Sequence, residues 1–164
     1  MPQRFRMTQA PDPGPAGASF ACVVAADPFA VRAGLARMFA APPLANLSGD
    51  HRGTAQVVLA EVLNNIAEHA YAVGPGKIAV ALRQTGAGLH CQVTDDGAAM
   101  PGGRLPAGDH PAQRRGGPNL PLQDLPLADL PEGGFGWHLI RRLTQDLHYA
   151  RVGGQNRLSF LIRA

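Results

Sequence analysis

The chain has 164 residues, of which 45% are hydrophobic, 5% aromatic and 16% charged. This length suits one domain with a single core, and no apolar run approaches the roughly 20 residues that a membrane-spanning helix needs. The net charge of +3 comes from 15 basic and 12 acidic residues that are scattered along the chain. Nucleic-acid-binding proteins usually carry a dense basic stripe with interleaved aromatic residues, which this sequence lacks. We therefore expect neither membrane insertion nor direct nucleic-acid binding.

Residues 1–18 are rich in proline and poor in apolar residues, which predicts a disordered leader. This segment lacks the apolar run of a secretory signal, so a cytoplasmic location is expected. Cys22 and Cys91 each fall in a strand-like apolar run and form no CxxC pair. They are predicted to be reduced core residues.

The predicted domain opens with a buried strand over residues 19–26, SFACVVAA. Residues 27–40 predict a helix, because Asp27 can cap its N-terminus and Pro28 fits its first helical position. Its expected apolar stripe consists of Phe29, Leu35, Met38 and Phe39. A second helix is predicted over residues 51–72, where the sequence VGPG then stops it.

The second half of the chain alternates strands with a long irregular segment. Residues 77–84 and 88–96 predict a β-hairpin, and residues 98–133 lose periodicity and become rich in proline and glycine. Such a long insert is typical of a functional flap. Residues 136–147 predict a helix, and residues 148–163 a closing hairpin. This order predicts an α+β sandwich with the helices on one face of a mixed, mostly antiparallel sheet.

Three polar residues recur four positions apart in the helical segment EVLNNIAEHAY, namely Glu61, Asn65 and His69. Since an α-helix turns about 100° per residue, they follow one line along the edge of its apolar stripe. The stripe consists of Val58, Leu59, Val62, Leu63 and Ile66. Each polar residue alone is more typical of a solvated or packed side chain, whereas the three together predict the wall of a pocket.

Asp95 stands at the end of a predicted strand in the sequence VTDDGAAMP, two residues before Gly97. A carboxylate at a strand end can point into a cleft, where it needs hydrogen-bond donors such as the amino group of adenine. Gly97 has no Cβ, so the backbone there can approach a flat ring. An ordinary turn explains the Asp-x-Gly pattern equally well.

Gly133 and Gly134 precede the predicted third helix and Gly136 begins it, in the sequence EGGFGWHLIRRL. The first N–H groups of a helix lack intrahelical partners, so a glycine-rich entry suits an anion such as phosphate. The spacing is neither that of a P-loop nor that of a dinucleotide fingerprint. A flexible hinge is the alternative reading.

In this order, EVLNNIAEHAY, DDGAA and GGFGWHLIRRLTQDLHYARVGGQNRLSF resemble the N-box and the two glycine boxes of the GHKL, or histidine-kinase-like, ATPase fold. Within it, the chain is similar to the anti-sigma-factor serine/threonine kinases of the RsbW type. The resemblance covers residues 19–164. It implies a Bergerat-type two-layer α/β sandwich in which residues 100–132 form an ATP lid.

The resemblance also implies roles for the helix line. Asn65 would be the Mg²⁺ ligand, and an amide oxygen is chemically suited because Mg²⁺ prefers hard oxygen donors and takes others from nucleotide phosphates. Glu61 would accept the proton of an incoming Ser or Thr hydroxyl, or orient that hydroxyl, during phosphoryl transfer. His69 would either line the nucleotide pocket or pack.

For the nucleotide itself, the resemblance implies that Asp95 binds the adenine amino group with Gly97 beside the ring. Gly134 and Gly136 would hold phosphates. The first glycine box usually reads D-x-G-x-G, whereas Ala99 replaces its second glycine here. The proline-rich lid is a second departure.

The implied function is an ATP-dependent protein serine/threonine kinase that acts as an anti-sigma factor. Its partners would be a sigma factor and a STAS-domain anti-anti-sigma protein, which it phosphorylates, and a homodimer is expected. The alternative is a nucleotide-gated binding module in the same partner-switching pathway, with little transfer of phosphate. A kinase of a response-regulator pathway without a sigma factor is a third possibility.

Overall fold

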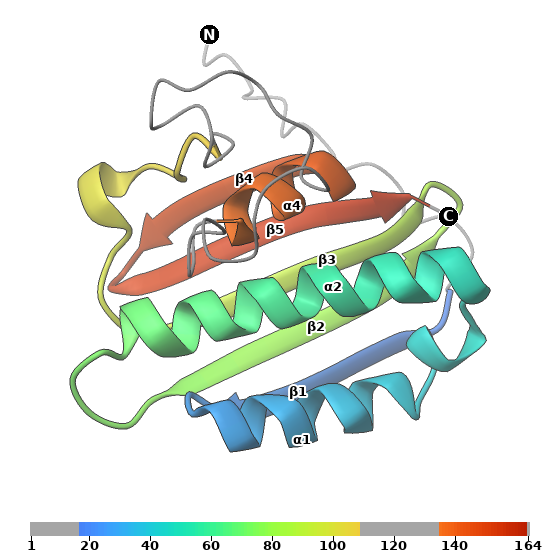
Figure 1. Cartoon of the computed structure of the whole chain (residues 1–164), viewed down its shortest axis with the longest axis horizontal. Coiled ribbons are helices and arrows are strands. Elements are labelled where there is room, and N and C mark those ends of the chain that lie inside the picture. The colour runs from blue at the N-terminus through green and yellow to red at the C-terminus, as the bar shows by residue number, and fades with distance from the viewer. Residues whose placement is uncertain (1–16, 109–134, 164) are drawn as a thin grey trace, which may run out of the picture.

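The computed structural model describes residues 17–108 and 135–163 (Figure 1). The predicted leader, residues 1–18, lies outside the described residues except for its last two positions. The predicted lid, residues 100–132, is described only as far as residue 108. The described residues form one sheet and one layer of helices.

Five strands form a single sheet in the order β1-β2-β3-β5-β4, and all four pairings between them are antiparallel. The strands are β1 (Ser19–Ala25), β2 (Lys77–Thr85), β3 (Gly88–Asp95), β4 (Gln145–Val152) and β5 (Gln155–Arg163). Their side chains alternate between a buried and an exposed face, as in β2, where every second residue from Ile78 to Leu82 is buried. The sheet therefore has one core face and one open face.

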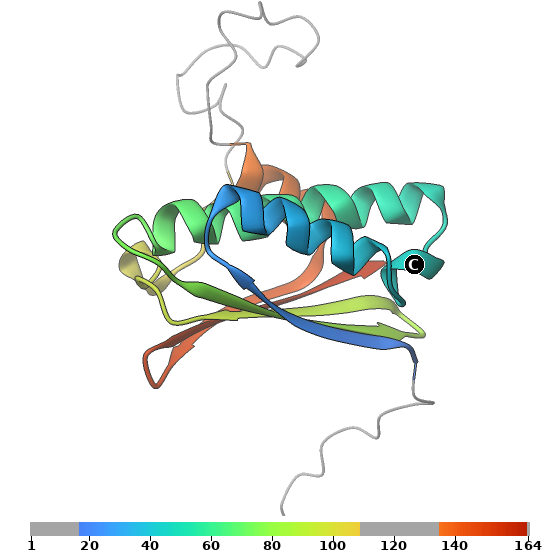
Figure 2. The same ribbon diagram turned by 90° about the horizontal axis from the view of Figure 1, so that it is seen from below.

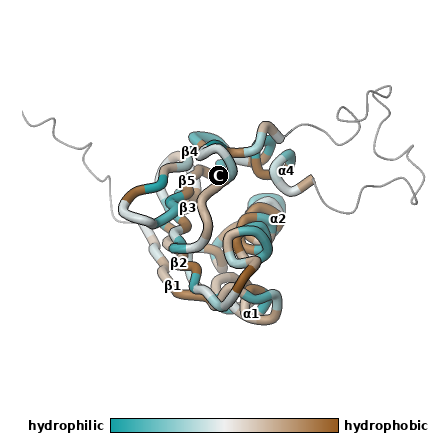
Figure 3. The backbone as a smooth tube through the Cα atoms, turned by 90° about the vertical axis from the view of Figure 1, so that its left-hand side faces the viewer, coloured by the Kyte–Doolittle hydropathy of each residue, from teal (hydrophilic) through white to brown (hydrophobic). Residues whose placement is uncertain are grey.

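The helices all cover the core face of the sheet (Figures 2 and 3). They are α1 (Pro28–Phe39), α2 (Gly49–Asn65) and α4 (Gly136–Leu143), with the short turns η1 (Leu44–Asn46), η2 (Ile66–Ala70) and η3 (Pro101–Gly103). This arrangement confirms the predicted α+β sandwich with helices on one face. The predicted mixed character of the sheet is not seen in its pairings, which are all antiparallel.

Helix α1 begins as its sequence predicts. The Asp27 carboxylate accepts hydrogen bonds from the backbone N–H groups of Phe29 and Ala30, at 3.0 and 2.9 Å. Gly34 allows α1 to lie close to β1, because a Cβ there would be 2.6 Å from a methyl group of Val24. The prediction that Phe29 belongs to the apolar stripe is wrong, since its side chain is 87% exposed.

Helix α2 begins at Gly49, two residues before the predicted start, and remains α-helical to Asn65. The chain then forms one π-helical turn, Ile66–Ala70, before β2. A π-helical turn holds more residues per turn than an α-helix, so the four-residue spacing of the polar line no longer keeps His69 in line with Asn65. This turn lies at the end of α2 that carries the candidate site.

Helix α4 is shorter than the predicted helix over residues 136–147, because it ends at Leu143. Thr144 is extended, with φ −123° and ψ 163°, and its hydroxyl donates to the carbonyl of Ile140 at 2.6 Å. Residues 145–147, which were also predicted as helix, instead begin β4. This strand contains a bulge between Gln145 and His148.

The core lies between the helices and the sheet. It is formed by apolar residues of α1, α2, α4 and all strands except the edge strand β4. Cys91 is fully buried there and Cys22 is half-buried, and both are free thiols, as predicted. Asp95 and Asn156 are the buried polar residues of the described part of the chain, each 6% exposed, and both belong to the candidate site.

Candidate functional site

Glu61 and Asn65 lie on α2 where its buried stripe meets the surface. Both are half-buried, whereas Val62 and Leu63 between them are at most 1% exposed. His69, the third residue of the predicted line, is exposed within the π-helical turn. The structure therefore keeps the carboxylate and the amide together and separates the imidazole from them.

Gly136, the first residue of α4, lies directly against these two side chains. A Cβ at this position would be 2.6 Å from Oε2 of Glu61, 3.2 Å from Nδ2 of Asn65 and 3.5 Å from its Oδ1. The predicted second glycine box and the predicted N-box thus meet at one point, although 70 residues separate them in the sequence. Gly134, the other glycine predicted to hold phosphate, lies outside the described residues.

The nitrogen of the Asn65 amide is buried without a hydrogen-bond partner. This Nδ2 is the one buried side-chain nitrogen or oxygen atom, within residues 17–108 and 135–163, that makes no hydrogen bond. Leaving such a group unsatisfied costs about 1–3 kcal/mol, so its retention calls for an explanation. A bound ligand that engages the amide would supply one.

Asp95 lies at the end of β3, with its carboxylate held by two donors. Its Oδ1 accepts from the Gly97 N–H at 2.9 Å and from Nδ2 of Asn156 at 2.8 Å. Burial raises the pKa of this carboxyl, while the hydrogen bonds from Asn156 and Gly97 lower it, and nearby Asp96 raises it. Both hydrogen bonds go to Oδ1, which leaves Oδ2 for a further donor.

Asn156 connects this carboxylate to the neighbouring strand and was not singled out from the sequence. Its Nδ2 also donates to the Ala98 carbonyl at 2.9 Å, and its Oδ1 accepts from the Tyr149 hydroxyl at 2.8 Å and from Nη1 of Arg151 at 2.7 Å. The sequence signal is an asparagine on the core-facing phase of β5, which otherwise carries Leu158, Phe160 and Ile162. Its partner across the strands is Asp95 itself.

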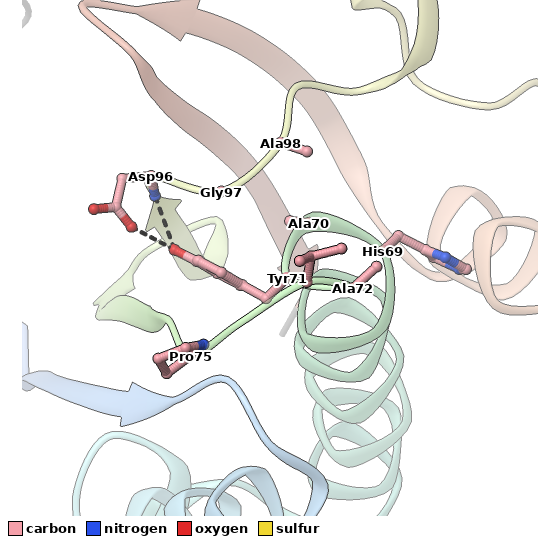
Figure 4. Close-up of a pocket in the computed structure, with 9 residues that line it drawn as sticks. His69, Ala70, Tyr71, Ala72, Pro75, Asp96, Gly97 and Ala98 are labelled. Carbon is pink, nitrogen blue, oxygen red and sulfur yellow. Dashed lines mark hydrogen bonds between the residues drawn. The ribbon is translucent and has the colours of Figure 1, made fainter.

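A cavity of about 480 Å³ opens at the end of α2 (Figure 4). It is lined by His69, Ala70, Tyr71, Ala72, Val73, Pro75, Asp96, Gly97 and Ala98. Its volume falls within the range of about 300–1,000 Å³ that is usual for small-molecule sites. The cavity therefore joins the end of the predicted N-box to the predicted first glycine box, with Asp96 rather than the buried Asp95 on its wall.

Two contacts hold the walls of this cavity together. The Tyr71 hydroxyl donates to Asp96 Oδ1 at 2.5 Å and accepts from the Asp96 N–H at 3.0 Å (Figure 4). Gly97 packs against the π-helical turn, since a Cβ there would be 2.6 Å from the Ala70 carbonyl oxygen. The absence of a side chain at Gly97 thus serves contact with the helix end, and its predicted place beside a ligand ring stays a prediction.

The described start of the predicted lid is attached to α4. Nε of Arg141 donates to the Pro106 carbonyl at 2.8 Å, and Nδ1 of His138 lies 3.0 Å from the Gly108 carbonyl. The described contacts therefore fix where the segment leaves the domain.

The family comparison agrees with this arrangement. The sequence model of the histidine kinase-like ATPase domain matches residues 24–162, which is most of the chain. The chain belongs to the histidine kinase-like ATPase family. Membership implies that this domain binds ATP, and the matched region contains Glu61, Asn65, Asp95 and Gly136.

No curated protein matches the chain closely enough to narrow its role within this family. In the described part of the histidine kinase-like ATPase domain, no helix is long and apolar enough to cross a membrane. The same residues contain no group of three or more His, Cys, Asp or Glu side chains that could hold a metal ion by themselves.

Glu61 and Asn65, which lie beside the first residue of α4, fit a bound Mg²⁺ ion. Mg²⁺ usually keeps several waters and takes one or two protein oxygens together with nucleotide phosphates, so it needs no protein cage. The Asn65 amide, whose Nδ2 is buried without a hydrogen bond, can offer its oxygen, because the two ends of an amide are interchangeable by rotation. The Glu61 carboxylate beside it can take a proton.

Proposed function

We propose that this domain is an ATP-dependent protein serine/threonine kinase that acts as an anti-sigma factor. It phosphorylates a STAS-domain anti-anti-sigma protein and sequesters a sigma factor. The observation that carries the kinase assignment is the meeting of the Glu61 carboxylate and the Asn65 amide at Gly136. A general base and a magnesium ligand beside a helix start, where anions are stabilised, are what transfer from ATP to a hydroxyl requires.

Glu61 and Asn65 divide this chemistry between them. Mg²⁺, when bound, neutralises charge on the phosphate oxygens. Asn65 contributes an oxygen ligand without adding negative charge beside them. Glu61 accepts the proton of the substrate hydroxyl while the hydroxyl oxygen forms a bond to the γ-phosphorus. The bond between the γ-phosphorus and the β–γ bridging oxygen breaks at the same time, which releases ADP.

At the other end of the site, Asp95 receives the adenine amino group on Oδ2. Its Oδ1 is already held by Asn156 and Gly97, which fixes the orientation of the carboxylate. The cavity at the end of α2 lies beside this residue, between the two predicted boxes. His69 lines that cavity, which supports the reading in which it contacts nucleotide rather than packs.

The proposed biological consequence is a partner switch. A phosphoserine or phosphothreonine carries nearly two negative charges at neutral pH, so phosphorylation can break a complex between the kinase and its substrate. The kinase is then free to hold the sigma factor. The expected homodimer and both partners are part of this proposal and rest on the sequence resemblance.

The kinase assignment is tested with Glu61→Ala, using γ-labelled ATP and a candidate STAS-domain protein. Loss of the base should lower transfer by about 10²–10⁴-fold while ATP binding is kept. Glu68→Ala is the matched control, because Glu68 is an exposed glutamate on the adjoining turn, outside the meeting point with Gly136. An undiminished rate in Glu61→Ala would remove the proposed base.

The second candidate function is a nucleotide-gated binding module with little phosphoryl transfer. Its support is Ala99, which stands where the first glycine box usually has its second glycine. The same labelled-ATP experiment separates the two functions. Label on a partner Ser or Thr supports the kinase, and nucleotide-dependent partner binding without label supports the module.

A further inference from the structure

The helices leave one face of the sheet uncovered (Figure 2). The charged residues at the paired positions of this open face are all cations. The strand positions of this face carry four exposed cations, which are Lys77, Arg83, Arg157 and Arg163. The five strands contain two acidic residues, of which Asp95 is buried and Asp146 lies in the bulge of β4, outside the paired positions. No carboxylate at a paired position therefore balances these cations. Exposed Asp96, directly after β3, adjoins Lys77, and its carboxylate accepts from the Tyr71 hydroxyl.

An apolar strip borders the cations on β1 and β2. The register places Ala21 opposite Ala81 and Val23 opposite Ala79, and all four residues are exposed, Val23 by 57%. Small side chains keep this strip flat. Lys77 and Arg83 stand at the two ends of the β2 side of the strip, six residues apart, a distance of about 20 Å.

The size of the open face suits a protein interface. Five strands about 4.8 Å apart and about eight residues long at about 3.3 Å each give a projected area of roughly 500 Å². The accessible area of a surface with side chains exceeds its projection, so this face approaches the about 800 Å² that each partner buries in a standard complex. Such interfaces combine apolar and charged surface, and this face offers both, the apolar strip on β1 and β2 and the cations beside it.

We infer that the open face of the sheet, with the apolar strip on β1 and β2 at one side and the cations Lys77, Arg83 and Arg157 beside it, is a docking surface for an acidic protein. A second copy of this chain is a poor occupant, because its own cations would face these across the interface. Nucleic acid is disfavoured because the paired positions of this face carry no Phe, Tyr or Trp side chain on which bases could stack. This surface lies on the opposite side of the sheet from Glu61 and Asn65, so the inference does not depend on the proposed kinase activity.

The test uses fluorescence anisotropy with a short poly-L-glutamate peptide as the probe, on the full chain at low and physiological ionic strength. The variant K77E/R83E/R157E should weaken binding by at least about tenfold, since it reverses the charges that face the probe. The matched control R32E/R104E/R142E changes net charge equally at exposed positions outside the strands, and should stay within about twofold. Circular dichroism confirms that both variants fold.

Each other outcome overturns the inference. Equal loss in both variants would show that the probe responds only to net charge. Duplex DNA or phosphatidylserine vesicles could bind more tightly than the peptide and lose this binding in K77E/R83E/R157E. That result would assign the face to another class of partner. A wild-type dimer in sedimentation that K77E/R83E/R157E dissociates would assign the face to a second copy of the chain.

Discussion

The contact between Gly136 and the two α2 side chains makes Gly136→Ala an informative substitution. The added Cβ would lie 2.6 Å from Oε2 of Glu61, and an ordinary contact begins at 3.4 Å, so the carboxylate must withdraw by about 0.8 Å. The Asn65 amide at 3.2 Å must move by a few tenths of an ångström. Both are ends of side chains, so this displacement costs little folding free energy, and the better helix propensity of alanine offsets part of it by up to about 1 kcal/mol.

The chemistry should be more sensitive than the fold. A displacement of about 1 Å in a reacting group can cost about 10²-fold in rate, so Gly136→Ala should lower ATP turnover by about 10- to 100-fold. The thermal unfolding midpoint should move by only a few degrees, because the free-energy change stays within about 1 kcal/mol. ADP release, followed in a coupled assay at saturating Mg-ATP, measures the turnover.

Gly53→Ala is the matched control for this experiment. Gly53 lies within α2, and a Cβ there would meet nothing within 4 Å. It should raise stability by about 0.5–1 kcal/mol and leave turnover unchanged. Wild-type turnover in Gly136→Ala would refute the reasoning that these side chains act at the contact with α4.

The remaining predictions concern the buried polar residues, the helix layer and the thiols. Asn156→Ala removes a donor that lowers the pKa of Asp95, so that pKa should rise further and the pH below which ATP binding weakens should move up in a calorimetric titration. The effect of Asp95 on stability has the opposite sign. Because the pKa of its carboxyl is higher in the folded protein than the unfolded value of about 3.9, this carboxyl stabilises the fold below that value. The contribution is lost as the pH rises through the folded pKa. Arg52→Ala removes hydrogen bonds of 2.9 Å to the Leu44 carbonyl in η1 and of 3.0 Å to the Phe39 carbonyl at the end of α1, and should cost about 2–3 kcal/mol in urea unfolding. Burial raises the pKa of the Cys91 thiol, so it should react with Ellman's reagent only as fast as the protein unfolds.

Each of these grouped predictions has a contradicting result. An unchanged pH midpoint for nucleotide binding in Asn156→Ala would separate Asn156 from Asp95 ionisation. A loss under about 0.5 kcal/mol in Arg52→Ala would mean that water replaces its hydrogen bonds, as at exposed positions. Rapid labelling of Cys91 in the folded protein would contradict its burial.

The strands and α1 could be predicted closely because their signals are local. Alternation of apolar residues over 77–84 gave β2, and Asp27 with Pro28 gave the start of α1. The end of α4 could not be predicted in this way, since residues 145–147 lack a helix-breaking residue and join β4 through their pairing with β5. Pairing across strands is a tertiary effect that overrides local propensity.

The candidate site divides along the same line. The spacing of Glu61 and Asn65 follows from helix geometry and was predictable, whereas the π-helical turn that exposes His69 was not. Asn156 reaches Asp95 only through the antiparallel register of β3 and β5, which the sequence does not state. The contact of Gly136 with Glu61 and Asn65 likewise depends on the packing of α4 against α2, which are far apart in the sequence.

The most direct test of the account is isothermal titration of ATP into the wild-type chain and Asn65→Ala, each with and without Mg²⁺. The account predicts that Mg²⁺ strengthens ATP binding to the wild type. Asn65→Ala should lose this Mg²⁺ effect, because the substitution removes the side-chain amide that is the proposed ligand. Metal-independent affinity in the wild type, or an equal Mg²⁺ effect in both proteins, would contradict it.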